Sequence, residues 1–86
     1  MREQVVLTGM VIKSAPAGEY DRRLVILTSE RGKITAFARG ARRPGSTLMA
    51  SSAPFVFGTF SLYEGRDAYS LVSVEVQNYF REITEN

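Results

Sequence analysis

Short runs of aliphatic, β-branched and aromatic residues, separated by turns that contain Gly or Pro, dominate this sequence. Such runs are too short and too rich in Val, Ile and Thr for stable helices, so they predict strands. The five predicted strands cover residues 4–13, 22–28, 33–39, 55–63 and 68–76. A chain of 86 residues has room for one hydrophobic core, and the strands therefore belong to one domain.

The connections indicate how these strands pair. Residues 29–32 end in a glycine that suits a short hairpin, and the polar residues 64–67 join the last two strands in the same way. Gly9 interrupts the first strand, which predicts a bulge or bend that lets one long strand serve both sides of a small closed barrel. Residues 14–21 contain Pro and Gly, and we expect a loop there.

The remaining segment, residues 40–53, is the least strand-like, and residues 46–51 predict a short helix capped by Ser46. Five strands with a bent first strand and a helix between the third and fourth predict an all-β, five-stranded OB-fold, a Greek-key barrel. An SH3-like barrel is the alternative, but barrels of that kind place their longest connection earlier in the chain.

The last two predicted strands carry apolar residues on both alternating faces. We interpret the largest of them as core or interface residues: Phe55, Phe57, Phe60, Leu62 and Leu71. Either the outside of the barrel is covered by a partner or a missing domain, or the register predicted for these strands is wrong.

Residues 77–86 predict the start of a helix whose Tyr79, Phe80 and Ile83 need a surface to pack on. This pattern indicates that the chain is truncated.

Cysteine and histidine are both absent from the sequence. Thiol, triad and zinc chemistry therefore lack their central groups, and Glu19 and Asp21 have no third ligand for a metal. Gly40 and Gly45 are not followed by the Lys-Ser/Thr of a P-loop. We predict a protein that is not an enzyme and uses no metal or cofactor. No apolar stretch approaches a membrane span, and the lack of cysteine favours a reducing cytoplasmic compartment.

Positive charge is concentrated in one third of the chain. Between residues 22 and 43 a single acid, Glu30, stands against a group of basic residues: Arg22, Arg23, Arg31, Lys33, Arg39, Arg42 and Arg43. Because strand side chains alternate, Ile34, Ala36 and Ala38 share one face of the third strand, and Lys33, Thr35, Phe37 and Arg39 share the other. One face of the third strand is therefore basic and aromatic.

We predict nucleic-acid binding on this face, through Arg31, Lys33, Phe37, Arg39, Arg42 and Arg43. A single surface arginine is more often a solubilising charge, but clustering on the usual OB-fold ligand face favours phosphate binding. An acidic protein tail would be attracted by the same field. Phe37 either stacks on a base or fills a barrel or interface position, and Tyr20 and Tyr69 are weaker stacking candidates.

These residues lie within motifs that resemble the N-terminal domain of the bacterial RecO family. The resemblance covers nearly the whole chain and is most specific in two runs, LTSERGKI (residues 27–34) and ARGARRP (residues 38–44). Further matches are AGEYDR (residues 17–22), PF (residues 54–55) and YEGR (residues 63–66).

The resemblance implies an OB-fold that binds single- and double-stranded DNA and anneals complementary strands in recombinational repair, with RecR as its partner and without a cofactor. It also implies a cytoplasmic, nucleoid-associated protein. Full-length members of the family continue into a helical C-terminal domain, so the resemblance implies that this chain is an excised domain or a fragment. Residues 1–80 are then the nucleic-acid-binding barrel, and residues 81–86 lead to a C-terminal domain that the chain lacks. The family's contacts to the single-strand-binding protein lie largely in that missing part. Two alternatives remain open, a protein-interaction adaptor that docks RecR or another repair partner, and an RNA-binding barrel.

Overall fold

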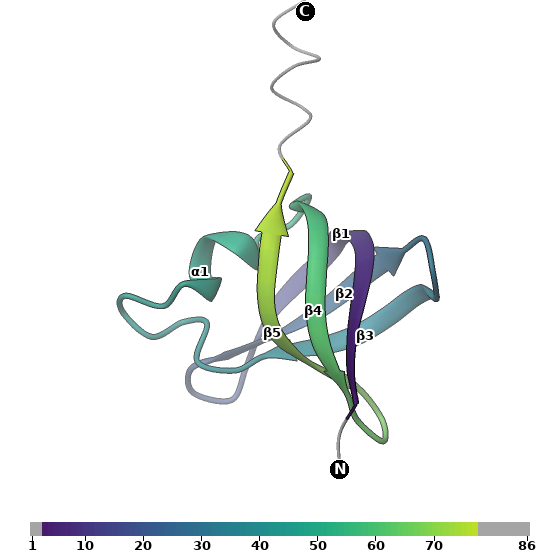
Figure 1. Cartoon of the computed structure of the whole chain (residues 1–86). Helices are drawn as coiled ribbons and strands as arrows, with labels where there is room; N and C mark the ends of the chain where they lie inside the picture. The colour runs from purple at the N-terminus through teal and green to yellow at the C-terminus, as the bar shows by residue number, and fades with distance from the viewer. Residues whose placement is uncertain (1–2, 78–86) are drawn as a thin grey trace, which may run out of the picture.

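A computed structural model describes residues 3–77 of the chain. Its elements are β1 (Gln4–Ala17), β2 (Asp21–Thr28), β3 (Gly32–Ala38), α1 (Leu48–Ser51), β4 (Phe57–Glu64) and β5 (Tyr69–Val76). The strands follow the order β1-β2-β3-β5-β4, and β1 closes the barrel by pairing with β4 (Figure 1). β3 and β5 are parallel, and the other neighbouring strands are antiparallel. The predicted five-stranded OB-fold, with a short helix between β3 and β4, is confirmed.

β1 is the longest strand and takes part in both sides of the barrel. Its first half pairs with β4 and its second half with β2, and Gly9 faces Thr28 on one side and Gly58 on the other. A Cβ atom on Gly9 would overlap the carbonyl oxygen of Leu27, so the strands approach closely here. The prediction of one strand shared by both sides is confirmed, although the bulge lies beyond Gly9, next to Val11.

The β1–β2 hairpin is longer than predicted. The prediction of a loop over residues 14–21 is wrong, because both strands continue into this stretch and leave only residues 18–20 as the turn. Pro16 of β1 pairs with Arg22 of β2. In this part of β1, β2 is the one neighbouring strand among residues 3–77, so β1 has an open edge here. Proline is tolerated in such an edge strand, and its presence does not end β1.

One apolar cluster fills the barrel. Its buried members are Leu7, Val11, Leu24, Ile26, Ile34, Ala36, Ala38, Ala41, Phe60, Leu62 and Leu71. The predicted alternation in β3 is confirmed, because Ile34, Ala36 and Ala38 are the buried residues of that strand. Removing this apolar surface from water is the main force that holds so small a barrel together.

A second bulge explains the apolar residues on both faces of β4 and β5. The register between these strands shifts beyond Ser61, so that Leu71 and Val74 both contact the core although they are three residues apart. Val72 lies between them and is exposed. A strict period of two does not anticipate such a shift.

The aromatic residues of this region separate into core and surface. Phe60 is fully buried, Phe57 is half-buried, and Phe55 is 65% exposed. Phe55 has a φ of 71°, in the left-handed region, and β4 therefore begins two residues later than predicted.

α1 lies between β3 and β4 in the chain and packs beside β5 (Figure 1). The predicted helix is confirmed over Leu48–Ser51. Ser46 Oγ accepts a hydrogen bond from the Leu48 N–H at 3.1 Å, although Thr47 holds the N-cap position. The described residues contain no helix with the length and hydropathy of a membrane span. The helix predicted from residue 77 and the tail 81–86 lie outside the described residues, apart from residue 77 itself.

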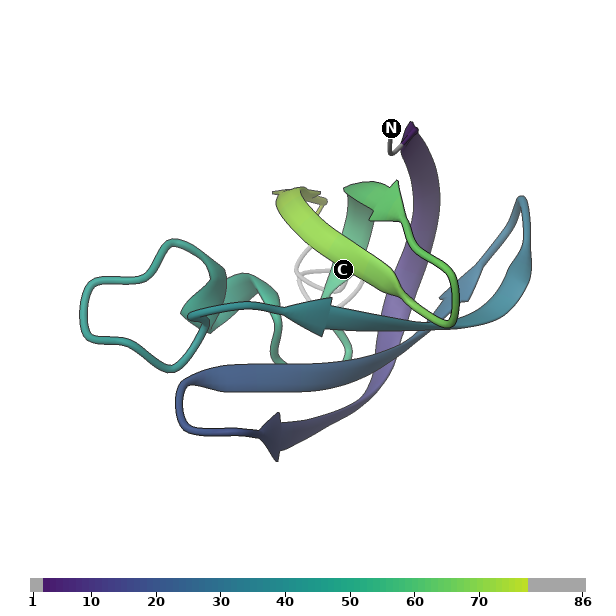
Figure 2. The ribbon, with the colours of Figure 1, turned by 90° about the horizontal axis from the view of Figure 1, so that it is seen from below.

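Two connections lie at each end of the β2–β3 ribbon. Figure 2 shows the β1–β2 turn beside the segment that leads from β3 to α1, and the β2–β3 turn near the β4–β5 turn at the opposite end. The barrel therefore presents the outer face of β2 and β3 between two pairs of connections.

Candidate nucleic-acid interface

The outer face of β2 and β3 is built from cross-strand pairs. The register places Arg23 beside Phe37, Val25 beside Thr35, and Leu27 beside Lys33. Their neighbours in sequence point into the barrel, so these six side chains share the outside. The predicted basic and aromatic face of β3 is thus present, and β2 adds a further arginine to it.

Phe37 lies one residue before the end of β3, at the end of this face that adjoins the segment after β3, and is half-buried. It belongs to the outer face and not to the buried core cluster. Phe37 pairs with Arg23 of β2 on one side and with Ser70 of β5 on the other. Arg23 is absent from the predicted site, although the hairpin turn at residues 29–32 fixes a register that places it opposite Phe37.

Residues 39–45, here called the basic segment, leave the end of β3 and fold back against the β1–β2 turn. The Arg42 N–H donates to the Tyr20 carbonyl oxygen at 2.8 Å, and the Gly40 N–H donates to Asp21 Oδ1 at 2.7 Å. The Arg43 guanidinium lies over the Tyr20 ring, 4.3 Å from its centroid, in a cation–π contact. These contacts hold a segment with three arginines in a defined position.

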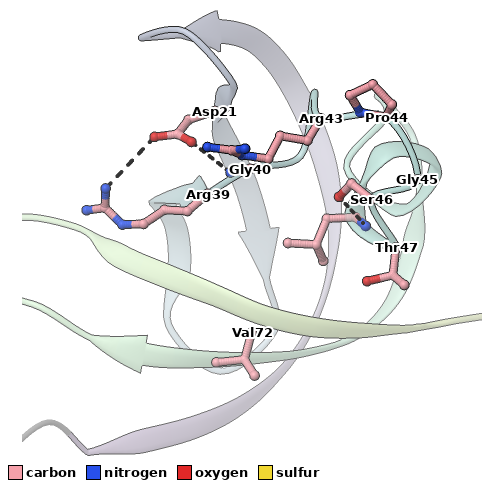
Figure 3. Close-up of a pocket in the computed structure, with 10 residues that line it drawn as sticks. Asp21, Arg39, Gly40, Arg43, Pro44, Gly45, Ser46, Thr47 and Val72 are labelled. Atoms are coloured by element: carbon pink, nitrogen blue, oxygen red, sulfur yellow. Dashed lines mark hydrogen bonds and ion pairs between the residues drawn. The ribbon is translucent and has the colours of Figure 1, made fainter.

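An open groove of about 840 Å³ lies between the basic segment, the start of α1 and Val72 of β5 (Figure 3). It is lined by Asp21, Arg39, Gly40, Arg43, Pro44, Gly45, Ser46, Thr47, Leu48 and Val72. Arg39 has a side chain that is 69% exposed, and its Nη1 lies 3.9 Å from Asp21 Oδ2. The groove thus combines two guanidinium groups with backbone and hydroxyl groups that suit a phosphate.

Arg31 and Lys33 lie at the opposite end of β3 from the basic segment. Arg31 Nη1 donates to Tyr69 Oη at 2.8 Å and to Glu64 Oε1 at 3.0 Å. The hydrogen bonds to Tyr69 and Glu64 hold the pKa of Arg31 above its ordinary value, and Glu64 compensates its charge. Lys33 lines a smaller groove together with Glu64 and Asp67.

The structure therefore divides the predicted site residues into three groups. Arg39, Arg42 and Arg43 gather in one segment at one end, Phe37 precedes this segment on β3, and Arg31 and Lys33 lie among acidic residues at the other end. Glu19 and Asp21 form no metal cluster, and the described residues hold no group of three potential ligands. Asp21 is instead bonded to the basic segment.

The family model described as "Recombination protein O N terminal" matches residues 1–80 of the chain. The chain belongs to the RecO family. The resemblance seen in the sequence motifs is confirmed.

The similar proteins include three with the name DNA repair protein RecO. The protein of Acetivibrio thermocellus is 41% identical over 76 residues, which are 88% of this chain and 30% of the relative. That of Alkaliphilus metalliredigens is 40% identical over 78 residues, 91% of this chain and 32% of the relative. That of Anaeromyxobacter dehalogenans is 40% identical over 80 residues, with 91% and 32% covered. The chain thus spans about a third of these relatives.

In OB-folds the usual ligand surface is the outer face of β2 and β3 with the β1–β2 and β4–β5 connections. In this RecO domain the first connection carries Tyr20 and contacts the basic segment, and the second carries Arg66 and Asp67. The excess of positive charge is therefore greatest at the end where the basic segment lies.

Proposed function

We propose that this RecO domain is a non-enzymatic module that binds single- and double-stranded DNA and promotes strand annealing in recombinational repair. The relatives named DNA repair protein RecO support a role in DNA repair. The observation that carries the proposal is the basic segment, fixed by Tyr20 and Asp21 beside the outer face of β2 and β3. That face is where OB-folds take oligonucleotides.

Phosphate neutralisation would supply most of the affinity. Arg39, Arg42 and Arg43 are exposed and carry forked donors that match phosphate oxygens. Each phosphate that an arginine neutralises releases condensed counterions, which makes binding favourable whatever the base sequence. Duplex and single strand share this backbone, so both are expected ligands.

Base contacts would come from the part of the face next to the basic segment. Phe37 offers a partly exposed ring, and Arg23 lies beside it on β2. A base that stacks on this pair leaves its Watson–Crick edge free, because stacking uses the flat face of the ring. Annealing then follows from charge screening between two strands and from exposure of their pairing edges, with no bond made or broken.

The test is a fluorescence-anisotropy titration of the chain onto a labelled single-stranded oligonucleotide at several salt concentrations. Binding should weaken linearly on a logarithmic plot against salt. Replacing Arg39, Arg42 and Arg43 together by Ala should reduce the slope by about 2, because each phosphate of a single strand that is no longer neutralised lowers it by roughly 0.7. Absence of binding at the lowest salt would overturn the proposal.

A single-charge control separates a site from net charge. Arg43→Ala and Arg66→Ala each remove one positive charge from an exposed residue, but Arg66 lies in the β4–β5 turn beside Asp67. We expect the larger loss of affinity from Arg43→Ala. Equal losses would mean that the domain acts as a diffuse positive body without a defined interface.

A second candidate function is docking of a repair partner such as RecR. It is favoured by a mostly apolar groove beside Gly9, lined by Met10, Leu27 and Phe57 among others. Leu27 is 50% exposed there. If the triple arginine variant keeps normal DNA affinity while Leu27→Asp abolishes co-elution with RecR, docking is the main role. Tighter binding of RNA than of DNA in the same titration would instead favour an RNA-binding barrel.

A further inference from the structure

Asp21 is the one carboxylate among the described residues that line the groove at the basic segment. Its two oxygens have different partners. Oδ1 accepts a hydrogen bond from the Gly40 N–H at 2.7 Å, and Oδ2 lies 3.9 Å from Nη1 of Arg39 (Figure 3). The side chain of Asp21 is 31% exposed, so the carboxylate is reached from the groove.

The hydrogen bond to Gly40 gives Asp21 a structural role. Gly40 has a φ of 70°, and it is the point at which the chain leaves β3 and turns toward the β1–β2 turn. A carboxylate oxygen that accepts from this N–H fixes where the basic segment begins. This role requires an acceptor atom at position 21 but not a negative charge.

The ion pair with Arg39 opposes DNA binding, whereas the hydrogen bond to Gly40 holds the basic segment in place for it. A phosphate approaching Arg39 brings the same sign of charge as Asp21 and needs the same donors. Because the Arg39 side chain is 69% exposed, its pairing with Asp21 is weak and open to exchange with water or another anion. A phosphate can therefore replace Oδ2 at Arg39 while Oδ1 keeps its bond to Gly40.

We propose that Asp21 is a positioning residue that also competes with DNA phosphate for Arg39, and so keeps the affinity of this groove for DNA below the value that the arginines alone would give. The inference rests on the proposed function and adds a control on it. An annealing protein has to release the paired strands, and a built-in competitor shortens the time that a phosphate stays bound.

The test separates the two roles of Asp21 with Asp21→Asn. Asparagine keeps Oδ1 as an acceptor for Gly40 and removes the negative charge. We expect Asp21→Asn to bind a labelled single-stranded oligonucleotide about two- to fivefold more tightly, the size expected for one charge several Å from a phosphate at a protein surface. Retained slow hydrogen exchange at the Gly40 amide shows that the basic segment is still held.

Two controls isolate the local effect. Glu19→Gln removes a negative charge two residues away, and Glu75→Gln removes one from the exposed surface of β5. Both should raise affinity less than Asp21→Asn does. Asp21→Ala loses the acceptor as well as the charge, and we expect its gain to be smaller than that of Asp21→Asn because the basic segment is released.

The outcomes distinguish this inference from the proposed function. In an Arg39→Ala background, Asp21→Asn should have no more effect than Glu19→Gln. If the wild-type chain binds DNA but Asp21→Asn binds it no more tightly than Glu19→Gln, the competition is wrong and the proposed function stands. If the wild type fails to bind DNA even at the lowest salt, both proposals are overturned, because the competition rests on the proposed function.

Discussion

The guanidinium of Arg43 covers one face of the Tyr20 ring, at 4.3 Å from the centroid. The contact joins the basic segment to the β1–β2 turn, next to the hydrogen bond from the Arg42 N–H to the Tyr20 carbonyl oxygen. Tyr20 therefore supports an arginine with the ring face that a base would otherwise use. DNA affinity should accordingly depend on this ring.

Tyr20→Leu should weaken binding of single-stranded DNA by about two- to fivefold, which corresponds to the roughly 0.5–1 kcal/mol of an exposed cation–π contact. Tyr20→Phe keeps the ring and should bind like the wild type. Anisotropy titrations of both variants check this. A loss of more than about tenfold in Tyr20→Leu would show that a base stacks on Tyr20 directly, since such stacking is worth about 1–3 kcal/mol.

Arg31→Ala should lower DNA affinity less than Arg43→Ala, although each removes one arginine. The reason is that Glu64 already compensates Arg31, whose Nη1 also donates to Tyr69. Arg31→Ala should instead lower the urea midpoint of unfolding, because it disconnects the β2–β3 turn from the β4–β5 turn. A larger loss of DNA affinity from Arg31→Ala would place the main phosphate contacts at that end of the barrel.

Gly9→Ala should destabilise the barrel by about 2–3 kcal/mol, in the upper part of the roughly 1–3 kcal/mol that forcing extra atoms into a packed position usually costs. The added Cβ would overlap the Leu27 carbonyl oxygen and crowd the Thr28 backbone, so β1 and β2 would have to move apart. Gly18→Ala is the matched control, since a Cβ there meets no atom within 4 Å and only the left-handed φ of 59° opposes it, at about 1 kcal/mol. Urea unfolding measures both, and equal losses would contradict the close approach at Gly9.

Glu30 should make stability depend on pH in the acidic range. The Thr8 N–H donates to Glu30 Oε1 at 2.9 Å, and this hydrogen bond lowers the pKa of Glu30 below 4.5. A lowered folded pKa contributes stability that is present above the unfolded value and lost as the pH falls through the folded value. The difference in urea midpoint between wild type and Glu30→Gln should therefore be largest near neutral pH and shrink as the pH falls through the lowered pKa of Glu30. An unchanged difference would mean that the hydrogen bond does not depend on charge.

The fold is largely predictable because its signals are local. Each strand is a short β-type run, and the hairpin at residues 29–32 fixes the register that places Phe37 outside and Ile34 inside. The errors arise where tertiary pairing overrides a local signal. Pro16 and Gly18 indicate a loop, but pairing with β2 extends β1 through this stretch as an edge strand. The bulge beyond Ser61 leaves no mark in the pattern of apolar residues except an ambiguous alternation.

The site is predictable to the same extent. Arg39, Arg42 and Arg43 lie together because they are close in sequence, and the motif alone brings them into one segment. The β2–β3 hairpin brings Asp21 to Gly40, but the partner of Arg31, Glu64, is brought near only by the closed barrel. Sequence therefore indicates where positive charge is concentrated but not which of these charges is already paired.

The sharing of β1 between two neighbours also orders events during synthesis. β1 to β3 form consecutive hairpins as soon as they leave the ribosome, but residues 4–10 wait for β4, which is made after the basic segment and α1. Until then this part of β1 offers an unpaired edge to any other extended chain. Closure by such a distant strand is slow compared with hairpin formation. The nascent domain is therefore most exposed to aggregation before β4 is available, and least once Gly9 is held between Thr28 and Gly58.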